Sequence, residues 1–80
     1  MKDGITEILG KTITGLVVKE RAGVPRSQVF LVFSDNTHFE FYCGNSVIHG
    51  TGGIWPGGIN EIRAYMSETS TIVLEAQLDN

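Results

Sequence analysis

The segment THFEFYC, residues 37–43, carries the side chains best suited to proton transfer. His38, Glu40 and Tyr42 follow one another at a spacing of two residues. Residues two apart share one face of a β-strand, so the three side chains form a row. Histidine titrates near neutrality and a neighbouring carboxylate tunes it, which makes His38 and Glu40 candidates for acid–base catalysis if the row lines a cleft. The alternative, which we favour, is the solvated outer face of a hairpin.

The soft metal ligands of the chain are His38, Cys43 and His49. Structural zinc requires four such ligands, usually with a close pair such as C-x-x-C, and no such pair occurs. An odd separation also sends His38 and Cys43 to opposite faces of one strand. We therefore predict no metal site and no cofactor, and we expect Cys43 to be a small apolar core residue.

The segment HGTGGIWPGGINEI, residues 49–62, concentrates glycine around the only tryptophan. It lacks the Lys and Ser/Thr of a phosphate-binding P-loop and the third glycine of a dinucleotide fingerprint. What remains is Gly57 and Gly58 ahead of a predicted helix, whose free N–H groups could hold an anion. The residues that could join a ligand or interface site here are Trp55, Gly57, Gly58, Asn60, Arg63 and His49. Arg63 could instead pair on the surface with Glu61 or Glu68.

Trp55 lies between Ile54 and Pro56. A large aromatic side chain in such a loop either folds back onto the core or stays exposed as an anchor for a partner or ligand. Both interpretations remain open from the sequence.

The hydrophobic periodicity predicts an α+β fold: an antiparallel sheet of four or five strands, one helix inserted before the last strand, and a short N-terminal helix. The firmest element is the hairpin formed by residues 27–34 and 37–43 around the turn SDNT. The expected elements are a helical turn at 3–9, strands at 11–20, 27–34, 37–43, a short piece at 46–49, a helix at 59–68 and a strand at 69–78.

The length of 80 residues corresponds to a single domain over residues 1–80, and a chain this short buries a modest core. A net charge of −3 with scattered basic residues argues against binding nucleic acid or a membrane surface. No apolar run is long enough to span a bilayer, and the acidic N-terminal segment does not resemble a signal peptide. The single cysteine fits a reducing compartment, so we expect a cytoplasmic protein.

The segments LGKTITGLVVKE and VFLVFSDNTHFEFY resemble short uncharacterised bacterial, phage and integron gene-cassette proteins. In these a strand beginning G-K-x-I precedes a hairpin that turns at F-S-D-x-T. The resemblance covers roughly residues 9–42 and carries no catalytic motif. It implies an accessory gene on a mobile genetic element, whose products are often small oligomeric binding proteins.

The strand at 27–34 is apolar on both faces. We expect the helix to hide Val29, Leu31 and Phe33, which leaves Phe30 and Val32 without a cover. A second copy of the chain would supply it, so we predict a homo-oligomer, most simply a two-fold dimer.

These features favour a non-enzymatic binding and oligomerising protein that meets a small molecule or a protein through the glycine-rich loop 50–58 and the adjacent helix start. One alternative is a sequestering protein or small enzyme for a phosphorylated or anionic molecule. Another is a purely structural subunit of an assembly.

Overall fold

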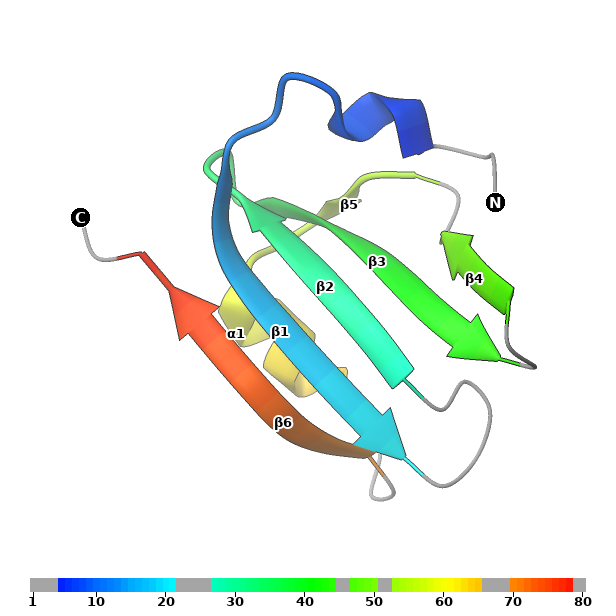
Figure 1. Ribbon diagram of the computed structural model, residues 1–80. Coiled ribbons are helices and arrows are strands. Elements are labelled where there is room, and N and C mark those ends of the chain that lie inside the picture. Colours follow the sequence, from blue (N-terminus) through cyan, green and yellow to red (C-terminus); the bar gives the residue numbers. More distant parts are fainter. Residues whose placement is uncertain (1–4, 22–26, 45–46, 51–52, 66–69, 79–80) are drawn as a thin grey trace.

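The computed structural model describes residues 5–21, 27–44, 47–50, 53–65 and 70–78. An antiparallel sheet of six strands dominates it, in the order β4-β3-β2-β1-β6, with β5 pairing with β3 outside this path (Figure 1). The elements are the 3-10 helix η1 (Ile5–Ile8), β1 (Ile13–Arg21), β2 (Ser27–Phe33), β3 (Thr37–Gly44), β4 (Val47–Gly50), β5 (Trp55–Pro56), the helix α1 (Ile59–Ala64) and β6 (Ser70–Gln77).

The predicted α+β class is confirmed in its coarse form, a mainly antiparallel sheet with one short α-helix, and the details differ. The sheet has six strands rather than four or five, because residues 47–50 and 55–56 each pair with β3. The helix is shorter than the ten residues predicted, and 66–69 lie outside the described residues. A strand also separates the helix from most of the glycine-rich segment, which is therefore not one irregular passage.

The hairpin of β2 and β3 turns as the sequence predicts. Asn36 occupies the left-handed region, with φ of 61°, a conformation that asparagine tolerates. Its N–H donates to the carbonyl of Phe33 at 3.1 Å and closes the turn. The register that follows sets Val32 opposite His38 and Phe30 opposite Glu40. Pairing therefore brings the candidate acid–base residues onto the same face as two large apolar side chains.

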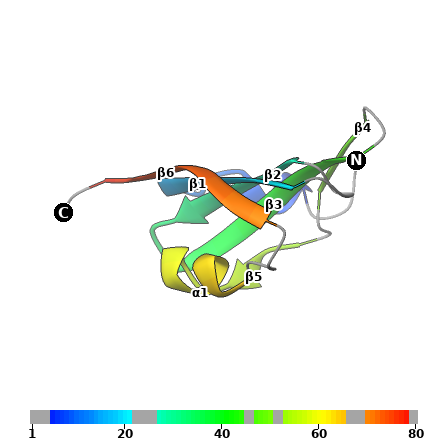
Figure 2. The ribbon, with the colours of Figure 1, turned by 90° about the horizontal axis from the view of Figure 1, so that it is seen from below.

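The sheet has two faces of different character. The helix face, over which α1 lies, carries Val17 of β1, Phe30 and Val32 of β2, and His38 of β3 (Figure 2). The opposite face, called here the open face, carries the alternate residues. The prediction that α1 covers Val29, Leu31 and Phe33 is therefore wrong, since these residues belong to the open face and the helix hides Phe30 and Val32.

The core of the helix face is a cluster that α1 completes. Its buried members are Val17, Phe30, Val32, Ile59 and Ile62, with Ile72 of β6 packed at its margin. Gly15 makes the close approach of α1 to β1 feasible, because a Cβ atom there would lie 3.1 Å from Cδ1 of Ile59. Transfer of these side chains from water is the main force that holds α1 on the sheet.

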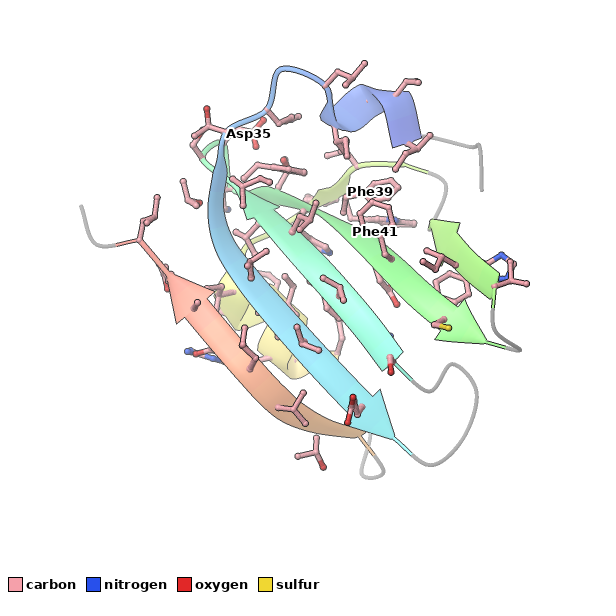
Figure 3. All side chains as sticks on the ribbon, in the orientation of Figure 1. Asp35, Phe39 and Phe41 are labelled. Atoms are coloured by element: carbon pink, nitrogen blue, oxygen red, sulfur yellow. The ribbon has the colours of Figure 1, made fainter. Side chains whose placement is uncertain are left out.

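The open face is only partly covered. Phe39 is fully buried and meets Phe41 edge-on, with ring centroids 5.0 Å apart, toward the end of the sheet where η1 is drawn (Figure 3). Farther along, Leu16, Ile48 and Leu74 have exposed fractions of 36, 57 and 48%. None of the described helices is long and apolar enough to cross a membrane.

Candidate functional site

A pocket of about 400 Å³ opens on the helix face between β3, β5 and the end of α1. Four side chains line it: His38 and Glu40 of β3, Trp55 of β5 and Tyr65, which follows α1 directly. The volume falls within the range of small-molecule sites. The pocket therefore joins two residues of the predicted acid–base row to the tryptophan of the glycine-rich segment.

The strand β5 brings Trp55 to the row. Trp55 pairs with His38 and Pro56 pairs with Thr37, which docks the loop against β3. Two further hydrogen bonds hold it, because the N–H of Gly57 donates to the carbonyl of Asn36 at 2.8 Å and Nδ1 of His38 lies 2.9 Å from the carbonyl of Gly57. Gly57 has φ of 108°, and this left-handed conformation turns the chain from β5 into α1.

His38 is buried, with 2% of its surface exposed. A carbonyl oxygen can only accept, so Nδ1 of His38 carries the proton and donates to Gly57. In the neutral ring this leaves Nε2 as an acceptor, and no described residue pairs with it. His38 thus has a structural bond on one nitrogen and, among the described residues, no partner on the other.

Glu40 is half-buried beside His38. Nε2 of Gln28 donates to Oε2 of Glu40 at 2.6 Å, which fixes the carboxylate from the neighbouring strand. Among the described residues no hydrogen bond reaches Oε1. The expectation of a solvated outer face is therefore wrong for this row, since His38 is buried and Glu40 is half-buried.

Lys19 lies close to Tyr65 of the pocket and was not predicted as part of any site. It is 1% exposed, and its Nζ donates to the carbonyl of Ile62 at 2.7 Å. The ammonium also lies 5.2 Å from the ring centroid of Phe30 and 6.0 Å from that of Tyr65. Burial lowers the pKa of Lys19, while the negative charge of Glu40 opposes this shift. The strand alternation that buries Val17 also places Lys19 on the helix face.

We expect the substitution Lys19→Met to remove a pH dependence of stability. A lowered pKa in the folded protein means that the unfolded chain binds more protons in the pH range between that pKa and the ordinary value of 10.5. The free energy of unfolding of the wild type should therefore gain from this residue as the pH rises through that range, and the methionine variant should lack this gain. Urea denaturation of both proteins between neutral and alkaline pH measures it. The free energy of unfolding of the wild type minus that of the variant should increase as the pH rises, and a difference that stays constant or decreases would contradict the assignment.

Trp55 and Tyr65 form the aromatic walls of the pocket. Their exposed fractions are 52 and 53%, so both rings are about half accessible. The ring of Tyr65 lies 5.5 Å from that of His38, centroid to centroid, at a tilt of 54°. Trp55 is therefore not folded back as a core residue. Tyr65 was not among the predicted site residues, and its place in the pocket depends on where α1 ends.

The other predicted residues do not line the pocket. The N–H of Gly58 donates to Oε1 of Glu61 at 2.7 Å, and the N–H of Gly57 is taken by Asn36, so both glycine N–H groups have partners. The carboxylate of Glu61 also occupies the helix start with negative charge. These contacts weigh against the predicted anion site at Gly57 and Gly58.

Asn60 and Arg63 lie on the exposed side of α1. Nε of Arg63 donates to Oε1 of Glu75 at 2.8 Å, and Nη1 donates to Oδ1 of Asn60 at 3.0 Å. The partner is therefore Glu75 of β6 and not Glu61, while Glu68 lies outside the described residues. The hydrogen bond from Arg63 lowers the pKa of Glu75.

His49 lies at the edge of the sheet, stacked on Tyr42 with ring centroids 5.2 Å apart. It pairs with Tyr42 in the register, whereas Trp55 pairs with His38. Cys43 is half-buried on the open face together with Phe41. No three His, Cys, Asp or Glu side chains gather for a metal ion in the part of the chain that the structure describes.

Two further hollows are less suited to specific chemistry. One of about 400 Å³ on the open face is lined by Ser27, Val29, Phe41, Tyr42, Cys43 and Ile48. Another of about 220 Å³ lies between the start of β1 and the end of β6. Neither brings a charged side chain to its wall, so the pocket of His38, Glu40, Trp55 and Tyr65 is the candidate site. Comparison of the chain with family models, with curated proteins and with solved structures finds no match.

Proposed function

We propose that this protein is a non-enzymatic binding module and that its ligand occupies the pocket of His38, Glu40, Trp55 and Tyr65. The observation that carries the proposal is a pocket lined by two half-exposed aromatic rings and by a carboxylate that Gln28 holds in place. Aromatic surfaces with a few fixed polar groups are typical of ligand sites. Trp55 belongs to the glycine-rich loop predicted to bind a ligand, and the binding surface also includes two residues of β3 and Tyr65.

Binding is favoured over catalysis by the partners of the two titratable groups. His38 bonds through Nδ1 to a backbone carbonyl, and Glu40 bonds to Gln28. Among the described residues no hydrogen bond links His38 to Glu40, so they do not form the base and orienting group that acid–base catalysis commonly uses. Both groups are positioned as fixed acceptors.

Intrinsic fluorescence provides a direct test, because Trp55 is the only tryptophan. Titration with three small aromatic probes that differ in charge, benzamidinium, benzamide and benzoate, should change the Trp55 emission in a saturable way for at least one of them. Tyr65→Ala should abolish the change, since it removes one wall. The matched variant Tyr42→Ala, which alters a tyrosine outside the pocket, should retain it. Absence of a saturable response to all three probes would contradict the proposed site.

We also propose that the protein is a homodimer and that a second copy pairs with β6. Its outer side has no partner strand among the described residues, and Val73 and Leu74 are 52 and 48% exposed. Long apolar edge strands without proline or lysine readily pair with another chain. Two-fold antiparallel pairing of β6 would extend the sheet and join the two open faces.

Sedimentation of the wild type at tens of micromolar should give the mass of a dimer. The variant Leu74→Lys should sediment as a monomer, and a monomeric wild type would overturn the proposal.

A further inference from the structure

We infer that the ligand of this pocket is a compact organic cation with N–H donors, such as an amidinium, guanidinium or primary ammonium group. The inference rests on the proposed function, and it names the chemical class that the pocket walls select. Three observations carry it: the polar atoms on the walls, the aromatic rings beside them, and the fact that the nearby positive side chains, Lys19 and Arg63, are bonded to other partners.

The polar atoms that the β3 side chains offer to a ligand are acceptors. Oε1 of Glu40 has no hydrogen-bond partner among the described residues, while Oε2 is held by Gln28. Nε2 of His38 is an acceptor in the neutral ring, because the proton is on Nδ1. Two acceptors on adjacent positions of one strand face match a ligand that donates more than one N–H. A carboxylate or phosphate ligand would instead meet the charge of Glu40 at close range.

The aromatic walls favour positive charge. The faces of tryptophan and tyrosine carry negative electrostatic potential, and they attract ammonium and guanidinium groups. Trp55 and Tyr65 are both about half exposed, so their rings are accessible to a ligand. The ring of Tyr65 already lies 6.0 Å from one ammonium, that of Lys19.

Among the described contacts, Lys19 forms no hydrogen bond and no ion pair with the carboxylate of Glu40. Its Nζ is bonded to the carbonyl of Ile62, and no ion pair within 4.0 Å joins Lys19 to Glu40 among the described contacts. With 1% of its surface exposed and its Nζ bonded to Ile62, Lys19 does not line the pocket, and its charge acts on Glu40 only from a distance. Arg63 is also unavailable, since it is paired with Glu75. Of the four side chains that line the pocket, Glu40 is therefore the one that carries a negative charge.

The test compares probes of one shape and different charge. Benzamidinium should bind to the wild type at least about tenfold more tightly than benzamide, and benzoate should bind more weakly than benzamide, as read from the emission of Trp55. Glu40→Gln should remove most of the preference for benzamidinium. Glu20→Gln, which makes the same change at an exposed position of β1 outside the pocket, should preserve it.

A second measurement keeps the inference testable if Glu40→Gln does not fold. Higher salt should weaken wild-type binding of benzamidinium and leave that of benzamide nearly unchanged, because salt screens the attraction to Glu40. Equal affinities for the two probes, or tighter binding of benzoate, would overturn the cation assignment and leave the pocket itself supported. If none of the three probes alters the Trp55 emission, the proposed function fails and the inference fails with it.

Discussion

Truncation of Ile62 to alanine should lower the free energy of unfolding by about 2–5 kcal/mol. Ile62 is fully buried and projects from α1 into the cluster of Val17, Phe30 and Val32. The helix has six residues, too few to be stable without packing, so its two buried isoleucines hold it on the sheet. Small domains have a total stability of about 5–15 kcal/mol, so the loss should be a large fraction of the whole. Urea denaturation measures it.

Ile48→Ala provides the matched control for Ile62→Ala. Ile48 is 57% exposed on β4 and loses the same atoms in the substitution. Its effect should be about 1 kcal/mol or less, which reflects the preference of strands for β-branched residues. Equal effects at the two positions would show that α1 does not depend on Ile62 for its place on the helix face.

Replacement of His38 by alanine should cost about 2–4 kcal/mol and alter the environment of Trp55. The substitution empties a buried ring site and removes the donor to the carbonyl of Gly57. The loop from Trp55 to Gly58 then loses a bond that fixes it to β3, so Trp55 should become more exposed to water. Denaturation measures the first effect, and a red shift of tryptophan emission in the folded variant measures the second.

His49→Ala is the corresponding control for His38. His49 stacks on Tyr42 at the sheet edge and is half-buried, so its removal should cost less than about 1 kcal/mol and leave the Trp55 emission unchanged. If His49→Ala shifts the emission as strongly as His38→Ala, the loop is not held by the bond from His38 to Gly57.

The hairpin of β2 and β3 was predictable because local residues determine it. The turn at Ser34 to Asn36 and the alternation on either side define the register, and with it the shared face of His38 and Glu40. What could not be predicted was which face α1 covers. Both faces of β2 are apolar, so the alternation specifies two sets of side chains and gives no reason to assign the helix to either.

Irregularities of the strands limited the rest of the prediction. A bulge between Val18 and Lys19 leaves Val73 without a partner in the register and sends Ile72 and Leu74 to different faces, although strict alternation places them on one. The pocket depends on another element that the sequence pattern does not reveal, the strand β5, which has two residues and includes a proline. Such a short strand has no periodicity to detect, and it is the pairing of Trp55 with His38 that assembles the site.

The most direct test is a ¹H–¹⁵N correlation spectrum of the labelled protein titrated with benzamidinium. We expect saturable chemical-shift changes at the indole N–H of Trp55 and at the backbone amides of His38, Glu40 and Tyr65, with little change at Leu16 and Leu74 on the open face. Saturable shifts confined to the open face, or no saturable shifts at all, would contradict a ligand site on the helix face.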